Sequence, residues 1–348
     1  MKRQLYCCLC CWCLPLVLWA QNGGKHAFAF LDLSPTPQVT TLGGIQPTFA
    51  DTNPAGAVQN PALLNAAMHQ QLSLNTMAYY GGINTGYVGY AQHFNNLATF
   101  ALGLQYVTYG TMDETDVFGQ NIGTFSSGEY ALYMSAAKAW GKWNVGTNIK
   151  LIFSNIAEFS ASGIAADAGV AYSDTATNFQ AGLMFKNMGT QMSTYNGTRE
   201  SLPFDVQIGI SKRLRYLPLR FYITANRLYQ WDIRYNDPTI VTNNAFNEES
   251  NEEKNYFFDN LFRHFVFGGE LLLGKTIALR VGYNFLRRQE LSLSGQRSLA
   301  GFSFGAGINI KRLQINYGLA TFHPAGATHH FGLNVRFGKN ISQKTSTP

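Results

Sequence analysis

The chain has 348 residues, of which 46% are hydrophobic and 13% charged, and it is rich in aromatic residues and glycine. This apolar content excludes a disordered chain. The formal net charge of +6, or +4 without Lys2 and Arg3, is too small to indicate nucleic-acid binding. Few charges and many Tyr, Phe and Gly residues are typical of a β-rich protein whose surroundings are partly lipid.

Residues 1–20 have the pattern of a secretory signal peptide. Lys2 and Arg3 give a positive start, an apolar stretch runs from Leu5 to Trp19, and Ala20 is a small residue at the expected cleavage site. All five cysteines lie in this segment, and no small residue directly precedes any of them, as lipidation would require. The exported chain is therefore expected to lack cysteine and disulfides.

The stretch from Thr52 to Met112 contains no Asp, Glu, Lys or Arg. A soluble surface carries about one charged residue in four. A membrane helix needs about 20 consecutive apolar residues, and Asn, Gln, Gly, Ser and Thr interrupt this stretch throughout. A transmembrane β-strand needs only about 9–11 residues of alternating character, and the second half of the stretch has that character.

Residues 21–70 are predicted to form an N-terminal plug segment. The sequence "NPALLNAAMHQ" places Asn60 before Pro61 and spaces its apolar residues in a short helical rhythm. Asn followed by Pro at the first helical position is a helix-start signal. A short helix directly before the first strand is most simply placed in the mouth of a barrel.

Period-two alternation recurs from residue 71 onward and predicts a transmembrane antiparallel β-barrel of about 14 strands, an all-β fold. In "RESLPFDVQIGISKR", for example, Val206, Ile208 and Ile210 suit lipid, whereas Asp205 and Gln207 on the other face suit the lumen. An even strand number is usual in bacterial single-chain barrels. The barrel is assigned to 71–338 and a periplasmic tail to 339–348. The predicted strands are 71–80, 83–94, 97–109, 128–139, 142–155, 162–173, 177–186, 202–213, 217–229, 262–273, 276–286, 297–310, 312–322 and 328–338.

The connections alternate in length, which predicts an orientation. Tight links follow the even-numbered segments, and longer ones follow most odd-numbered segments, notably 110–127, 187–201, 230–261 and 287–296; "GGIN" is a short exception. Acidic residues gather in 110–127 and 230–261, and Lys and Arg gather in the tight links. Outer-membrane barrels have short periplasmic turns and long extracellular loops. We therefore expect an outer-membrane location with both termini periplasmic.

Three patterns invite a chemical interpretation. Ser135 and Lys138 match S-x-x-K, but they fall inside a strand pattern without the partner motifs of penicillin-recognising enzymes. The sequence "HPAGATHH" is interpreted as a polar loop, with metal binding as the alternative. Charged residues on lumen-facing positions are expected to pair with each other or with the plug, or else to line a pore. They are Lys150, Asp167, Asp205, Arg220, Glu270, Arg280 and Arg336. The sequence predicts no catalytic, cofactor-binding or metal-binding residue and no enzyme.

The longest connection, Trp231 to Asn260, combines an acidic run with apolar and aromatic residues. Loops of this length are usually functional or disordered, and aromatic side chains dominate protein interfaces. Tyr256, Phe257 and Phe258 are therefore predicted to bind a partner, the alternative being that they join the aromatic girdle at the membrane boundary.

The segment 30–65, "FLDLSPTPQVTTLGGIQPTFADTNPAGAVQNPALLN", resembles the FadL-like outer-membrane barrels of the Bacteroidetes, in particular their type IX secretion branch. The resemblance rests on the order of "FLDL", "LGG", "FAD" and "NPALLN". It implies fourteen strands and an N-terminal plug whose motif is Asn60, Pro61 and Ala62, with Asn53, Pro54 and Ala55 as a second candidate.

For function, the resemblance implies a non-enzymatic barrel without a cofactor. Such a barrel anchors a PorZ-like protein in a surface attachment complex with PorV and the sortase PorU, where cargo is joined to anionic lipopolysaccharide. The alternative is a channel for hydrophobic small molecules, as in the transporter branch of the FadL-like barrels. An apolar pocket near the plug and a lateral opening would indicate that alternative.

Overall fold

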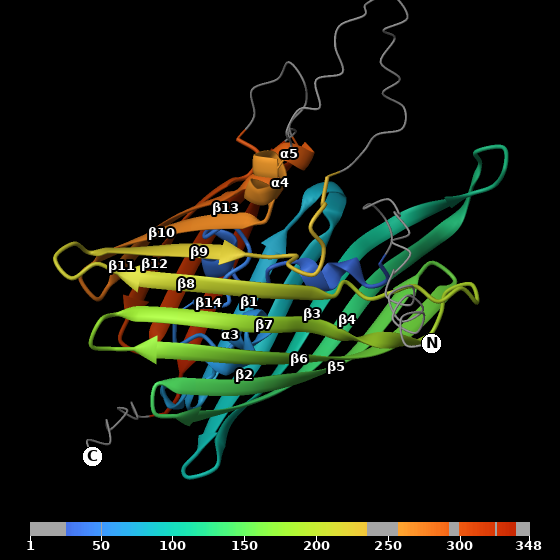
Figure 1. The fold of residues 1–348 in the computed structure, drawn as a ribbon. Helices are drawn as coiled ribbons and strands as arrows, with labels where there is room; N and C mark the ends of the chain where they lie inside the picture. The colour runs from blue at the N-terminus through green and yellow to red at the C-terminus, as the bar shows by residue number, and fades with distance from the viewer. Residues whose placement is uncertain (1–25, 50, 235–256, 292–298, 324–325, 339–348) are drawn as a thin grey trace, which may run out of the picture.

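Fourteen antiparallel strands close into one barrel in the computed structural model, which describes residues 26–49, 51–234, 257–291, 299–323 and 326–338. Each strand pairs with its neighbours in the sequence, and β1 closes the barrel against β14 (Figure 1). The predicted barrel with about 14 strands is confirmed. The strands are β1 Gln71–Ala78, β2 Asn84–Phe94, β3 Ala98–Thr115, β4 Asn121–Trp140, β5 Trp143–Ile156, β6 Phe159–Asp174, β7 Phe179–Ser193, β8 Asp205–Arg213, β9 Leu219–Ala225, β10 Phe265–Leu273, β11 Ile277–Asn284, β12 Phe302–Ile310, β13 Leu313–His323 and β14 Gly326–Arg336.

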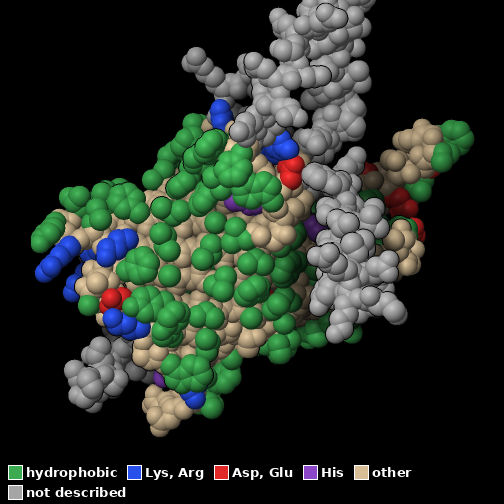
Figure 2. Space-filling view, in the orientation of Figure 1, with side chains coloured by type: hydrophobic (Ala, Val, Ile, Leu, Met, Phe, Trp, Pro, Cys, Tyr) green, Lys and Arg blue, Asp and Glu red, His purple; other side chains and the backbone are tan. Residues whose placement is uncertain are grey.

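The alternation in the sequence sorts side chains between the two faces of the wall. In β8, Ile208 and Ile210 are exposed on the outside, whereas Gln207 and Ser211 are buried inside. Figure 2 shows hydrophobic side chains scattered over the outer wall and Lys and Arg gathered at the end that carries the short turns. The outer surface therefore suits lipid, because nothing but apolar side chains can face hydrocarbon at little cost.

Two expectations about the long connections are wrong. The predicted loop 110–127 is mostly strand, because β3 continues to Thr115 and β4 begins at Asn121, and the two pair as a ribbon. This ribbon extends beyond its neighbours β2 and β5, so most of its side chains are exposed on both faces and need no alternation. The predicted strand 276–286 ends at Asn284, and the predicted connection 287–296 begins instead as helix α5 (Phe285–Leu291), which lies beside α4 (Phe257–Arg263) at the long-connection end (Figure 1).

The N-terminal segment occupies the lumen (Figure 1). Its short helical turns contact the inner wall, and their bounds are η2 Ala29–Asp32, α2 Pro37–Thr40, α3 Gly56–Gln59, η3 Pro61–Leu63 and η4 Ala66–Met68. A further turn, η5 (Tyr80–Gly82), links β1 to β2. In the described ranges, no helix has the length and hydropathy needed to cross a bilayer.

The described chain begins and ends at opposite ends of the barrel. His26 bridges to Ser201 in the long β7–β8 connection, whereas Arg336 bonds through its backbone to Arg312 in a short turn. Residues 26–70 thus run the length of the lumen. The periplasmic placement of both termini stays a prediction, because the ends of the chain lie outside the described residues. The predicted signal peptide, 1–20, and the predicted tail, 339–348, lie outside the described residues.

Candidate functional site

The plug rests on a series of lumen-facing glycines in nine strands, and these contacts define the candidate site. At each position an added Cβ would come within 3.2 Å of a plug atom, so any larger residue would push the plug away from the wall. Neighbouring strands pair these glycines directly, as in Gly146 with Gly169 and Gly305 with Gly318. The glycines are Gly146, Gly169, Gly182, Gly209, Gly268, Gly282, Gly305, Gly318 and Gly332.

The predicted plug motif lies against the first pair of these glycines. Asn60 is fully buried; its side chain accepts a hydrogen bond from the Ala62 N–H at 3.0 Å and donates to the Pro47 carbonyl at 3.0 Å. Pro61 occupies the first position of η3, where its missing N–H leaves no unpaired donor. An added Cβ would lie 1.9 Å from Asn60 Oδ1 if placed on Gly169, and 2.5 Å from the Pro61 carbonyl carbon if placed on Gly146.

Asparagines of β5 hold the same part of the plug through its backbone. Asn144 Nδ2 donates to the carbonyls of Ala62 and Leu64 at 2.5 and 2.8 Å, and Asn148 Nδ2 donates to the Ala57 carbonyl at 2.9 Å. Short helical turns leave carbonyl groups without intrahelical partners. The wall supplies these partners, so the plug is fixed by polar contacts as well as by close packing.

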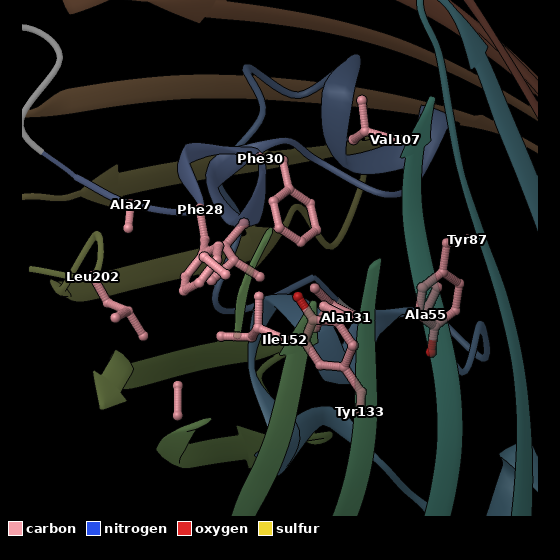
Figure 3. Close-up of a cluster of buried hydrophobic side chains, with 14 residues drawn as sticks. Ala27, Phe28, Phe30, Ala55, Tyr87, Val107, Ala131, Tyr133, Ile152 and Leu202 are labelled. Atoms are coloured by element: carbon pink, nitrogen blue, oxygen red, sulfur yellow. The ribbon is translucent and has the colours of Figure 1, made fainter. Parts of the chain in front are cut away.

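Apolar clusters complete the seal on either side of these contacts. Figure 3 shows the larger cluster, where Phe28, Phe30 and Leu202 lie near Tyr133 and Ile152 of the wall. Its members are all nearly excluded from solvent. Two further clusters join the plug to other sectors of the wall, one around Leu64 and Met68 and one around Leu42, Phe49 and Tyr222.

The lumen-facing charges pair within the barrel. Lys150 and Asp167 form an ion pair of 2.7 Å, and both side chains are fully buried. Lys150 also donates to Asn187 Oδ1 at 2.5 Å, while Asp167 accepts from Asn148 and from the Asn187 N–H. A buried ion pair persists only when hydrogen bonds satisfy its remaining donors and acceptors. This one therefore requires all four residues.

A second charged group lies among β9, β10, β11 and β13. Arg280 Nε donates to Glu270 Oε1 at 2.9 Å, and Arg280 Nη1 donates to Asn316 Oδ1 at 3.0 Å. The Tyr222 hydroxyl donates to the other carboxylate oxygen of Glu270 at 3.1 Å, and Arg220 lies 3.7 Å from it. Asp205 accepts from Gln207 and the Arg227 N–H, and Arg336 donates to Thr52 of the plug.

A small polar cavity lies between the plug and strands β1, β2 and β14. It is lined by residues that include Ser34, Pro37, Thr76, Thr85 and His330, and its volume is about 10 Å³. This is about the space that one water molecule needs. The cavity is far smaller than a pocket for an organic ligand, which measures about 300–1,000 Å³.

The motifs with a possible chemical role do not assemble into a reactive site. Ser135 points into the lumen and is buried, whereas Lys138 is exposed on the opposite face of β4 because three residues separate them along a strand. His330 faces inward between Thr40 and Thr328, while His329 faces outward and bonds to the Tyr317 hydroxyl. For His323 the structure describes the backbone alone. In the described part of the chain, no three His, Cys, Asp or Glu residues are grouped to hold a metal ion.

Two of the three aromatic residues predicted to bind a partner are described. Phe257 and Phe258 begin α4 with exposed fractions of 50% and 65% and contact each other edge to face. Phe257 also packs on Trp231, which stacks on His264. Tyr256 lies outside the described residues.

No protein-family model matches the sequence, and no curated protein matches it significantly. Solved structures do match. The toluene transporter TbuX of Ralstonia pickettii is 12% identical, with a TM-score of 0.53 over 90% of this chain and 100% of that one. The deltaS2 mutant of the monoaromatic hydrocarbon channel TodX is 14% identical, with a TM-score of 0.51 over 87% of this chain and 97% of that one. A deltaS2S3 mutant of TodX is 13% identical, with a TM-score of 0.50 over 86% and 96% of the two chains. At these identities the similarity shows the fold alone, a closed antiparallel β-barrel, which in this chain has fourteen strands.

Proposed function

We propose that this chain is a plugged outer-membrane anchor of the type IX secretion system, resembling PorQ. In this role it holds a PorZ-like surface protein next to PorV and the sortase PorU while cargo is joined to anionic lipopolysaccharide. The observation that carries the proposal is the seating of residues 26–70 on lumen-facing glycines. A plug so closely packed and hydrogen-bonded suits a static support. We assign the anchor to the type IX secretion system by the resemblance of its N-terminal motifs, which occur in the order "FLDL", "LGG", "FAD" and "NPALLN".

The partner is proposed to contact α4 at the long-connection end. Phe257 and Phe258 are exposed there, and aromatic side chains of this kind become hot spots when a partner buries them. Replacing both by Ala should release the partner into the medium while the barrel still assembles. If the partner stays bound to this variant, another connection must make the contact.

The second candidate is a channel for hydrophobic small molecules. It is favoured by the fold comparisons, because the matched structures TbuX and TodX are described as a toluene transporter and a monoaromatic hydrocarbon channel. Under this function the plug has to shift to open an apolar path. The cavity beside His330, with room for one water, does not supply that path in this conformation.

Affinity purification separates the two candidates. The tagged chain is extracted from outer membranes in mild detergent, and its partners are identified by mass spectrometry. The anchor predicts PorV, PorU and a PorZ-like protein above the level recovered with an unrelated tagged barrel. Recovery of none of these proteins, together with loss of toluene uptake in cells that lack the chain, would favour the channel.

A further inference from the structure

The β3–β4 hairpin is a free-standing ribbon at the long-connection end of the barrel (Figure 1). Its partner strands stop early, since β2 pairs with β3 as far as Thr108 and β5 pairs with β4 as far as Gly128. Beyond these points β3 and β4 pair with each other alone, from Thr111 with Ser126 to Thr115 with Asn121. At about 3.3 Å per residue the ribbon extends about 20 Å past the wall. Both of its edges carry main-chain groups without a strand partner.

The tip of the hairpin is a turn held by hydrogen bonds. The Asp116 carboxylate accepts hydrogen bonds from the N–H groups of Phe118 and Gln120, both at 2.9 Å, and the backbone of Asp116 bonds to Gln120 and Gly119. This fixed turn directs its two largest apolar side chains outward. Val117 is 94% exposed and Phe118 is 85% exposed. These two adjacent side chains form a small exposed apolar patch on a hydrogen-bonded turn, and a partner that buried them would gain free energy.

The charge of the hairpin selects the kind of partner. Residues 110–127 contain Asp113, Glu114 and Asp116 and neither Lys nor Arg. Among the residues that the structure describes, none of these carboxylates has a cation within 4.0 Å. Three unneutralised carboxylates repel anionic lipid and lipopolysaccharide and attract a basic protein surface. Figure 2 shows acidic side chains close to the apolar tip.

We propose that this hairpin docks a surface protein that has an apolar pocket with a basic rim. Phe118 and Val117 enter the pocket, the carboxylates of Asp113 and Glu114 face the rim, and the free edges accept a strand of the partner by β-augmentation. This inference rests on the proposed function, because it names the chemistry of the partner that the anchor holds. It adds a second contact to the one proposed for α4.

The test places a photoreactive phenylalanine analogue at position 118 in intact cells and maps the cross-linked peptide. The proposal predicts one surface protein, cross-linked beside apolar residues flanked by Lys or Arg. Phe118→Ala with Val117→Ala should lower retention of that protein by about 30-fold, the scale of an aromatic hot spot. Asp113→Asn with Glu114→Gln should weaken retention and flatten its salt dependence, and it leaves the turn-forming Asp116 in place.

Matched controls lie on the neighbouring hairpin at the same end. Phe159→Ala and Glu158→Gln alter an exposed aromatic and an exposed carboxylate there, and they should leave retention unchanged. Different migration of boiled and unboiled samples on a gel verifies that each variant barrel assembles. If the hairpin variants retain the partner as the wild type does, the docking proposal is overturned and the anchor function stands. Cross-links to lipopolysaccharide, or to a second copy of this chain, would also overturn it. If the wild type retains no surface protein, the anchor function fails as well.

Discussion

Substitution of Gly169 by Ala tests how the plug is held. The added methyl carbon would lie 1.9 Å from Asn60 Oδ1, and real Cβ contacts are essentially never shorter than 3.0 Å. The carboxamide therefore has to move by about 1 Å, which breaks its hydrogen bonds to Ala62 and Pro47. Overpacking costs about 1–3 kcal/mol, and each buried polar group left unpaired costs about 1–3 kcal/mol. With the overpacking and one unpaired group together, we expect the seating of the plug to weaken by about 2–6 kcal/mol.

The assay is limited proteolysis of residues 26–70 in the purified barrel, combined with solute entry into proteoliposomes. Gly169→Ala should make the plug cleavable and raise permeability, whereas the strands and the heat-modifiable migration stay unchanged. The matched control is Gly269→Ala, since a Cβ there meets its nearest atom, Val281 Cγ1, at an ordinary 3.4 Å. Equal protection of the plug in both variants would refute the argument from close contact.

Three further predictions follow from the plug and its surroundings. Lys150→Met should lower the free energy of unfolding by about 3–5 kcal/mol, because it leaves the buried Asp167 carboxylate without its cation. Urea titrations should show that adding Asp167→Leu restores most of this loss. Equal stability of the single and the double variant would contradict this prediction. Hydrogen bonds from Arg234 lower the pKa of Asp232, so its stabilising contribution is complete above about pH 4 and is lost as the pH falls through the lowered value. Protection factors for amide exchange in 226–234, which remove the intrinsic pH dependence of exchange, should therefore fall on acidification in the wild type but stay nearly constant in Asp232→Asn. Pro61→Gly should raise the permeability of proteoliposomes, because the fixed φ that starts η3 is lost. Unchanged permeability would show that this turn does not help to close the barrel.

The barrel itself is predictable from sequence because lipid on one side and a filled lumen on the other impose a period of two on every strand. The predicted strand boundaries are wrong where the period of two no longer applies. Residues 110–127 extend past the neighbouring strands, so their hairpin shows no alternation, and Phe285 continues the alternation by residue type although it begins a helix. Loop lengths predict an orientation for the barrel, but they say nothing about the path of a segment inside it.

The sequence predicts the turn at Asn60 and Pro61, which the structure places inside the barrel, but it does not predict the wall that receives this turn. Asn60 and Pro61 carry a recognisable turn signal, whereas the glycines beneath them occur among 34 in the chain. Lumen-facing glycines that pair across neighbouring strands, such as Gly146 with Gly169 and Gly305 with Gly318, are a usable signal. Depth along the barrel depends on register between strands, which a single sequence does not specify. The alternation places Lys150 and Asp167 on the lumen side of adjacent segments, but it does not specify which lumen-facing charges pair.

The central claim is that this barrel holds a surface protein and is not a path for solutes. The most direct measurement compares the PorZ-like protein on washed cells and in the medium, in cells with the wild-type chain and in cells that lack it. The account predicts that loss of the chain moves this protein from the cell surface into the medium, and that restoring the chain restores retention. Full retention on cells without the chain would contradict the account.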